Sequence, residues 1–337
     1  MENGQDRRQL QFWLGMFISA ASLAAIFLLI DPAEVLAALR SARYGYLILS
    51  ALGVVAFLML RAVRWRFMLG NQIAWRQVFH IQNIGYMLTS ILPFRIGDVA
   101  RAVLIGNVPP VTFPQGLSTM VVERVLDLLF IVTLLPFTLA EVGTLPENVQ
   151  TVARFAGVLA VAAIVTLVVA ANQRPLARRL VTFVLDRIYF LDTAAWVRRL
   201  DELLSGLSSL TRLGDGLLLG ALSVLVWVPI LFAYHAGLLA VNLRPTPAMT
   251  AFVVCAAALS VTAPSSPGQV GVFHAAVIFA LVQILGQPDG PSVSFAFLYH
   301  ALNILIMLLL GVIGVYRIGA TLRNVIATTQ SLMKRKQ

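Results

Sequence analysis

Six long apolar runs restrict this chain more than any other feature of its sequence. Each is long enough for a helix to cross the hydrocarbon core of a bilayer, which takes about 20 residues. Backbone groups inside lipid must bond to each other, so such segments form helices. Only 12% of the 337 residues are charged, against about 25% in a soluble domain. The sequence therefore predicts an all-α integral membrane protein with about six full spans, at residues 12–30, 44–60, 117–140, 152–171, 217–241 and 293–316.

Two further apolar segments, residues 77–106 and 248–286, are interrupted in the same way. Both contain the pattern Pro-x-x-(Ile/Val)-Gly, at residues 93–97 and 267–271. Proline and glycine break or loosen helical hydrogen bonds, and broken backbone at membrane depth occurs only inside protein or beside a wet cavity. A matched pair of broken segments, one in each half of the chain, is typical of a transporter's binding site.

The basic residues predict the orientation of the chain. Arginine and lysine gather in three connections, at residues 61–76, 174–212 and 317–336. Cytoplasmic loops carry this excess, so we expect these connections and both termini on the cytoplasmic side. Residues 141–150 and 287–292 contain no Lys or Arg and are expected outside.

With this orientation, each broken segment returns to the side from which it enters. Residues 77–106 are expected to form a re-entrant hairpin from the cytoplasm, and residues 248–286 an opposed hairpin from outside. The flanking spans then make an inverted repeat of residues 44–140 and 216–316 within one polytopic domain, residues 1–337. The alternative is that complete spans replace the hairpins, which gives eight to nine spans in all. This arrangement agrees equally well with the positions of Arg and Lys in the loops.

Residues 172–214 are predicted to form a cytoplasmic amphipathic segment. Leu176, Leu180 and Phe183 recur at helical spacing, on the face opposite Arg178. A helix on the inner membrane surface and an ordinary linker helix packed on the spans fit this pattern equally well. The net charge of +10 comes from basic residues beside apolar runs, which indicates anionic lipid headgroups as partners and no nucleic acid.

Six ionisable residues lie within two of the predicted membrane segments. They are Arg95, Asp98 and Arg101 in the first hairpin and Glu123, Arg124 and Asp127 in the following span. A charge at the membrane centre costs about 2.5–3.5 kcal/mol, so each needs a partner. Glu123 and Asp127 share one helix face, which Arg95 and Arg101 can neutralise. An ion-pair lock, a site for an anionic phosphate and a proton relay all fit this set.

The second hairpin offers mostly uncharged groups. Its candidate ligand-binding residues are Ser266, Pro267, Gly268, Gln269, Gly271 and His274. Exposed amides at a half-helix N-terminus suit an anion, and a kinked packing junction fits equally well. His300 and Asn303 share one face of the last span and are expected to hydrogen-bond this hairpin. Tyr234 and His235 are expected to be satisfied interior groups.

No enzyme signature occurs in the sequence. It contains no glycine-rich phosphate loop, no Gly-x-Ser-x-Gly and no His-Glu-x-x-His motif, and its single cysteine is Cys255. We therefore expect a protein that is not an enzyme and that uses no cofactor and no metal. An embedded enzyme that uses Glu123, Asp127 and His274 is the alternative.

Three ordered motifs resemble those of a known family. They are residues 92–101 (LPFRIGDVAR), 122–127 (VERVLD) and 267–271 (PGQVG). Together they resemble the signatures of the lysylphosphatidylglycerol synthase transmembrane-region family, also described as flippase-like, over roughly residues 12–320. The positions that match the family pattern are Arg95, Gly97, Asp98, Arg101, Glu123, Arg124, Asp127, Pro267, Gly268 and Gly271. Asp98 stands where the family more often has Glu, which keeps the charge but shortens its reach. His274 stands where the family's motif often has Glu, which weakens an acid-based role for the second hairpin.

The resemblance implies a multi-pass protein of the bacterial cytoplasmic (inner) membrane. Its expected function is that of a flippase-like translocase for an anionic phospholipid or lipid-linked headgroup, bound by the candidate residues of both hairpins and the span between them. The alternative is a non-catalytic membrane partner of a lipid, hopanoid or glycan biosynthetic enzyme. Full-length synthases of the family carry a soluble aminoacyltransferase domain, which this sequence lacks, so this chain alone is not expected to aminoacylate lipids.

Overall fold

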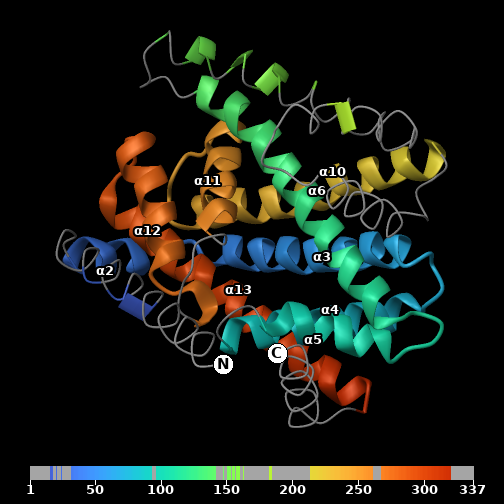
Figure 1. The fold of residues 1–337 in the computed structure, drawn as a ribbon. Helices are drawn as coiled ribbons and strands as arrows, with labels where there is room; N and C mark the ends of the chain where they lie inside the picture. The colour runs from blue at the N-terminus through green and yellow to red at the C-terminus, as the bar shows by residue number, and fades with distance from the viewer. Residues whose placement is uncertain are drawn as a thin grey trace.

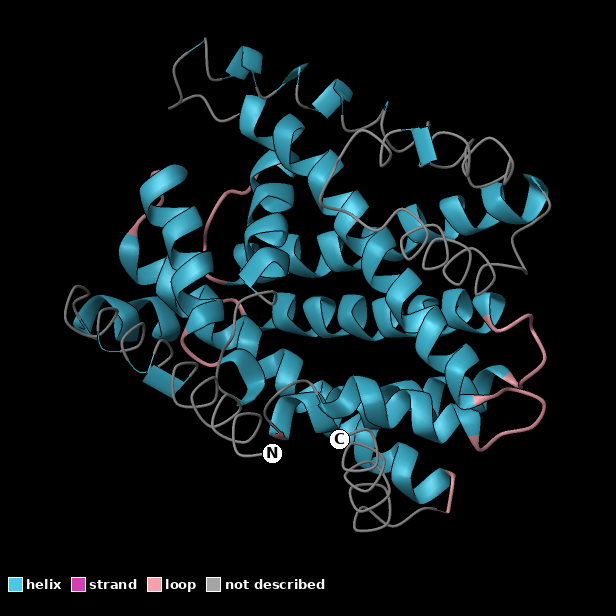
Figure 2. Ribbon diagram, in the orientation of Figure 1, coloured by secondary structure: helices cyan, strands magenta, loops and turns pink. Residues whose placement is uncertain are grey.

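A computed structural model describes most of the chain. The continuously described ranges are residues 32–92, 96–141, 213–260 and 267–319. All regular secondary structure within them is helical (Figure 2), as the apolar runs predict. The predicted spans at residues 12–30 and 152–171 and the amphipathic segment at residues 172–214 lie outside these ranges.

Figure 1 shows the helices of the described ranges in chain order. In the first half they are α2 (Pro32–Arg40), α3 (Tyr44–Met68), α4 (Trp75–Ile91), α5 (Ile96–Gly106) and α6 (Phe113–Ala140). In the second half they are α10 (Leu213–Ala240), α11 (Pro247–Ser260), η2 (Pro267–Gln269), α12 (Val272–Ile278), η3 (Phe279–Ile284) and α13 (Asp289–Arg317). By length and apolar composition, α3, α10 and α13 are able to cross a membrane. The protein is thus a helical membrane protein.

Helices α3 and α10 lie along each other at the centre of the molecule (Figure 1). Gly53 permits this close approach, because a Cβ atom there would lie 2.8 Å from the carbonyl oxygen of Pro229 and 2.9 Å from the Cβ of Ala233. Small residues at such crossings let membrane helices gain dispersion contacts, since lipid provides no hydrophobic drive for association.

Helices α4 and α5 fold back on each other around residues 92–95. They cross at Gly85 and Gly97, where a Cβ atom on Gly97 would overlap the carbonyl oxygen of Gly85. The loop before α4 and the loop after α5 lie at the same end of α3, because Leu69, Ile73 and Val111 belong to one buried cluster (Figure 2). The α4–α5 segment therefore enters and leaves at one end of the molecule.

The second broken segment, α11–η2–α12–η3, enters and leaves at the opposite end of α3. The loop before it contacts the start of α3, since Asn242 donates to the carbonyl oxygen of Ser41. The helix after it starts beside α2, because Gly290 packs on the backbone of Glu34. At its tip, a Cβ atom on Gly268 would lie 3.1 Å from the carbonyl oxygen of Ser90 on α4, so the two broken segments meet inside the molecule.

Helix pairs in the first half have counterparts in the second. Helix α4 packs on α13 as α11 packs on α6, and α5 packs on α6 as α12 packs on α13. Helices α3 and α10 pack on one another. Several helix contacts of the first half therefore recur in the second half.

Candidate functional site

Five buried charged residues join α3, α5 and α6 in one cluster. Arg61 and Arg64 come from α3, Arg101 from α5, and Glu123 and Asp127 from α6, and none is more than 8% exposed. Nη2 of Arg61 pairs with Glu123 and, at 2.8 Å, with Asp127. Nη2 of Arg64 donates to Asp127 at 2.8 Å. Nη2 of Arg101 donates to Glu123 at 3.1 Å. Two carboxylates thus face three guanidinium groups.

The guanidinium groups retain hydrogen-bond donors that the protein does not use. The Nε atoms of Arg61, Arg64 and Arg101, and Nη1 of Arg64, are buried without a partner among the described residues. Leaving a buried donor unpaired costs about 1–3 kcal/mol. Arg101 is further held by aromatic rings, with its Cζ atom 4.3 Å from the ring centroid of Trp65 and 5.1 Å from that of Tyr86. Surplus positive charge with unused N–H donors is the chemistry of an anion site.

A second, more exposed ion pair joins α5 to α6. Nη2 of Arg124 donates to both carboxylate oxygens of Asp98, at 3.0 and 3.1 Å. The side chains of Arg124 and Asp98 are 39% and 25% exposed. Arg95, which the sequence predicts to neutralise Glu123 and Asp127 together with Arg101, lies outside the described residues.

The loop position predicted from the sequence for Arg61 and Arg64 is wrong. Because they directly follow an apolar run, the sequence alone predicts a cytoplasmic loop for them. Helix α3 instead continues to Met68 and buries both side chains. Their spacing was the available signal, since residues three apart share one face of a continued helix, as Glu123 and Asp127 do at a spacing of four.

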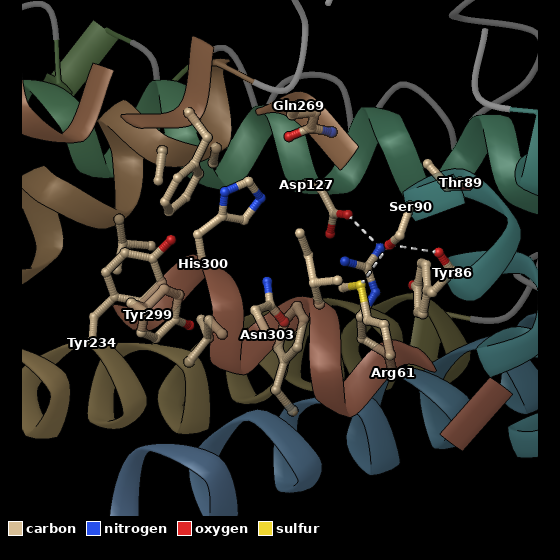
Figure 3. Close-up of a pocket in the computed structure, with 18 of the residues that line it drawn as sticks. Arg61, Tyr86, Thr89, Ser90, Asp127, Tyr234, Gln269, Tyr299, His300 and Asn303 are labelled. Carbon is tan, nitrogen blue, oxygen red and sulfur yellow. Dashed lines mark hydrogen bonds and ion pairs between the residues drawn. The ribbon is translucent and has the colours of Figure 1, made fainter. Parts of the chain in front are cut away.

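A cavity of about 240 Å³ lies between the tips of the two broken segments (Figure 3). The residues of its charged end are Arg61, Asp98, Arg124 and Asp127. The uncharged polar residues of its wall are Tyr234, Gln269, Tyr299, His300 and Asn303. In Figure 3, Tyr234 and Tyr299 lie at one end of the cavity and Arg61 lies at the other, and Asn303 lies between the tyrosines and Arg61. Tyr234, expected to be an interior group, is buried and contributes to the cavity wall.

A chain of hydrogen bonds between two histidines holds the tip of the second broken segment. Nε2 of His300 lies 2.8 Å from the carbonyl oxygen of Gly268, and because a carbonyl only accepts, Nε2 carries the proton. Nδ1 of His300 accepts from Nε2 of His274 at 3.2 Å. Nδ1 of His274 accepts from the amide of Gly271 at 3.2 Å. This bonding pattern fits two neutral imidazoles, and it bears out the expected bond from His300 to the hairpin.

The remaining predicted residues of the second hairpin have different positions. Gly268 and Gln269 line the cavity, whereas His274 is buried behind His300 and does not. Gly271 precedes α12 with a φ of 92°, which favours glycine. Pro267 begins η2, and Ser266 lies outside the described residues. Within the described ranges, no group of three or more His, Cys, Asp or Glu side chains is placed to hold a metal ion.

The fold and site are those of a polytopic helical membrane protein with a charged interior cavity. The chain belongs to the lysylphosphatidylglycerol synthase TM region family, which it matches over residues 12–311. It is similar to the glycosyltransferase AglD of Haloferax volcanii, with 22% identity over 369 aligned positions that cover 98% of this chain and 58% of that protein. The chain thus spans 58% of the length of this curated relative. No solved structure matches the chain.

Proposed function

We propose that this protein is a lipid translocase that carries an anionic headgroup through the cavity between its two broken segments. Membership of a lipid-related membrane family supports this role, as do the apolar helices around the cavity. The observation that carries the proposal is the buried cluster, in which three guanidinium groups face two carboxylates and keep N–H donors that no described residue pairs.

A phosphate group matches this cluster in charge and geometry. A guanidinium binds a phosphate through two parallel N–H···O bonds and tolerates burial better than an ammonium group. Arg61 is the arginine of the cluster that lines the cavity, beside Asp127, and its Nε donor has no partner among the described residues. A bound phosphate would compete with Glu123 and Asp127 for Arg61, which couples headgroup binding to the contact between α3 and α6.

We also propose that α4–α5 and α11–η3 are opposed re-entrant hairpins of an inverted repeat. Their entry from opposite ends of α3 supports this arrangement, and so do the matching helix contacts of the two halves. With basic connections on the cytoplasmic side of the bacterial inner membrane, the cavity would lie near mid-membrane. A headgroup would then pass from one hairpin tip to the other.

Movement in this proposal involves no covalent step. The sequence contains no nucleotide-binding motif, so the headgroup would move down its gradient or with a coupled ion. Carboxylates paired with arginine, as Glu123 and Asp127 are, serve to hold the guanidinium groups in place between transport events.

Headgroup flipping in proteoliposomes tests the proposal. The purified protein would be reconstituted with acyl-labelled phosphatidylglycerol, and the reagent-accessible fraction of label would be followed over time. With wild type, the reagent-accessible fraction of labelled lipid should rise above the fraction that lies in the outer leaflet at the start. Arg61→Gln should slow this by about tenfold or more, because a charged hydrogen bond is worth about 1.5–3 kcal/mol. Arg76→Gln, the same change at an exposed position of α4, is the control and should behave as wild type.

The variant Arg61→Lys tests whether lipid binding needs the guanidinium group or only a positive charge at this position. It keeps the positive charge that Glu123 and Asp127 require, but lacks the planar fork that binds phosphate bidentately. The variant should fold, bind lipid weakly and flip slowly. Equal rates for wild type, Arg61→Lys and protein-free vesicles, across several anionic lipids, would reject the translocase role.

A non-catalytic partner of a lipid or glycan biosynthetic enzyme is the second candidate function. The relative named as a glycosyltransferase supports it, because that protein extends well beyond the length that this chain matches. The arginines of residues 174–212 would form the docking surface. Replacing them with glutamine should then abolish formation of the cellular lipid product while flipping in vesicles stays unchanged. The translocase role predicts that the cavity variants abolish both.

A further inference from the structure

Two buried histidines connect the tip of the second broken segment, residues 267–271, to α13. The histidine chain of hydrogen bonds starts at the amide of Gly271, passes through the rings of His274 and His300, and ends at the carbonyl oxygen of Gly268. The two histidines are 3% and 7% exposed. Both ends of the chain are backbone groups of the same tip, so the tip is held to α13 through the two rings.

The histidine chain cannot take up a further proton without losing a hydrogen bond. An amide N–H only donates and a carbonyl oxygen only accepts, so both ends of the chain are fixed. Its three hydrogen bonds use three hydrogens, one on the amide of Gly271 and one on each neutral ring. A fourth hydrogen gives one ring two N–H groups, and one of these must then point at another N–H. Protonation of either histidine therefore replaces one attraction with a repulsion.

The backbone of the tip depends on these hydrogen bonds. Gly268 has a φ of 68°, Gln269 of 59° and Gly271 of 92°. Residues with a side chain seldom adopt this left-handed region, and strained backbone persists only where its surroundings hold it. Loss of one bond from the histidine chain therefore favours a different conformation of the tip.

The groups packed on the two rings do not compensate a positive charge. Phe297 stacks on His274 with 4.2 Å between ring centroids, and Phe273 lies 4.5 Å from His300 by the same measure. Neither histidine forms an ion pair with a carboxylate in the described part of the chain. Burying an unpaired charge is costly, so a protonated pair is more stable where the tip has moved and water reaches the rings.

The other titratable groups of this region keep their charge on mild acidification. The groups that are neutral there are Tyr86 on α4, Tyr234 on α10, Cys255 on α11 and Tyr299 on α13. The charged groups of the cavity wall are Arg61, Asp98, Arg124 and Asp127, and both aspartates pair with arginines. His235 on α10 bonds to Thr250 and does not line the cavity, and η3 contains no titratable residue. Histidine is the side chain that ordinarily changes charge between about pH 5 and 8.

The position of the tip connects such a change to the cavity. Gly268 and Gln269 on η2 and Ser90 on α4 all line the cavity (Figure 3). The tip touches α4 closely, because a Cβ atom on Gly268 would lie 3.1 Å from the carbonyl oxygen of Ser90. Release of the tip from α13 would therefore widen the cavity between η2 and α4.

We propose that the His274–His300 pair is a proton-binding site that releases the second tip, and that the proton and an anionic headgroup favour each other's binding. His300 lines the cavity, so a phosphate bound there provides the negative charge that the surroundings of the rings lack. Two ligands coupled in this way raise each other's affinity by the same factor. The role of the proton in headgroup movement rests on the proposed translocase function.

Dipolar broadening between two spin labels tests the proton-binding site in the absence of lipid. The labels would be attached through Val270→Cys on the tip and Ile91→Cys at the end of α4, in a Cys255→Ala background. These two positions are 36% and 50% exposed. The broadening should weaken as the pH falls from about 7.5 to about 5.5, the range in which histidine changes charge, because the labels move apart.

Matched variants assign the response to the two histidines. His300→Gln and His274→Gln each remove one titratable ring, so each should give a spectrum that does not change over this range. Thermal unfolding checks that both variants are folded. His80→Gln makes the same change on α4 outside the cavity and should keep the wild-type response.

Added lipid tests the link between the proton and the headgroup. Phosphatidylglycerol, added to the labelled protein in an uncharged detergent, should move the midpoint of the response to higher pH. A shift of about one pH unit corresponds to a tenfold mutual increase in affinity. Uncharged digalactosyldiacylglycerol should give no shift. Arg61→Lys meets the same micelle surface charge and should keep the response but lose the shift.

The outcomes separate the proton-binding site from the translocase function. A spectrum that does not change with pH, in protein whose flipping depends on Arg61, would overturn the proton-binding site alone. A pH response that persists in both histidine variants would also overturn it. Equal shifts in wild type and Arg61→Lys would overturn the link to the headgroup. A histidine-dependent response in protein that neither binds nor flips lipid would support the proton-binding site and overturn the proposed function.

Discussion

Arg64 on α3 and Asp127 on α6 form a buried ion pair with 2.8 Å between Nη2 and the carboxylate oxygen. Arg64 has no exposed surface, so its charge depends on Asp127 for compensation. Removing one partner of a buried pair costs about 3–5 kcal/mol, because the other charge is left uncompensated. We expect Asp127→Asn to lower the stability of the purified protein by this amount, measured by thermal unfolding in detergent.

Glu141→Gln provides the matched control for that substitution. Glu141 follows α6 at an exposed position, and the change from carboxylate to amide has the same size. Its unfolding temperature should stay close to that of wild type. Equal losses for Asp127→Asn and Glu141→Gln would show that the buried cluster does not stabilise the α3–α6 contact.

The pair Asp98–Arg124 should behave differently from the buried cluster. Both side chains are partly exposed, and exposed pairs contribute about 0–1 kcal/mol. Neutralising either residue should therefore change stability little, although both line the cavity. The swapped variant, Asp98→Arg with Arg124→Asp, should recover stability in the same unfolding measurement. A loss as large as that of Asp127→Asn would contradict the difference in burial.

Gly97 is expected to be essential for the α4–α5 crossing. An alanine Cβ there would overlap the carbonyl oxygen of Gly85, and overpacking of this kind costs about 1–3 kcal/mol. Gly97→Ala should lower the unfolding temperature and the yield of folded protein. Gly45→Ala on α3, where no atom of the described residues lies within 4 Å of the new Cβ, should be neutral or stabilising. Similar behaviour of the two variants would argue against the close crossing.

The histidine chain should make the second tip sensitive to acid. A protonated His274 would turn an N–H toward the amide of Gly271, and a protonated His300 would turn one toward His274, so either event breaks the chain. The series of hydrogen bonds through the two histidines should therefore be complete at neutral pH and should break as the pH falls. Hydrogen exchange of the amides around residues 268–274, corrected for the intrinsic pH dependence, should accelerate on acidification.

Two variants check the origin of that acceleration. His300→Gln should give fast exchange at these amides already at neutral pH, with little further change on acidification. His80→Gln alters a histidine of α4 outside the chain and should keep the wild-type profile. Exchange that does not depend on pH in wild type would contradict the assigned tautomers.

Local sequence features located the main parts of this fold. Pro93 predicted the break between α4, which ends at Ile91, and α5, which begins at Ile96, because proline lacks the amide donor of a helical hydrogen bond. Membership of the family, expected from three motifs, is confirmed over residues 12–311. A proline break and a short motif depend only on neighbouring residues, so they can be recognised in a single sequence.

Long-range partners were harder to predict. Arg61 and Arg64 looked like loop residues because an apolar run ended before them, and only the distant Glu123 and Asp127 make their burial possible. Tyr299 in an apolar helix resembles an ordinary core residue, and its place in the cavity wall depends on the packing of other helices around it.

Photocrosslinking of a lipid headgroup shows directly whether the headgroup binds in the cavity. A phosphatidylglycerol analogue with a diazirine on its headgroup would be reconstituted with the protein, illuminated, and its adducts mapped by mass spectrometry. Binding there should give adducts on cavity-lining residues of α3, α4, η2 and α13, and these adducts should be lost in Arg61→Lys. Adducts restricted to the outer ends of the helices, or unchanged in Arg61→Lys, would contradict headgroup binding in the cavity.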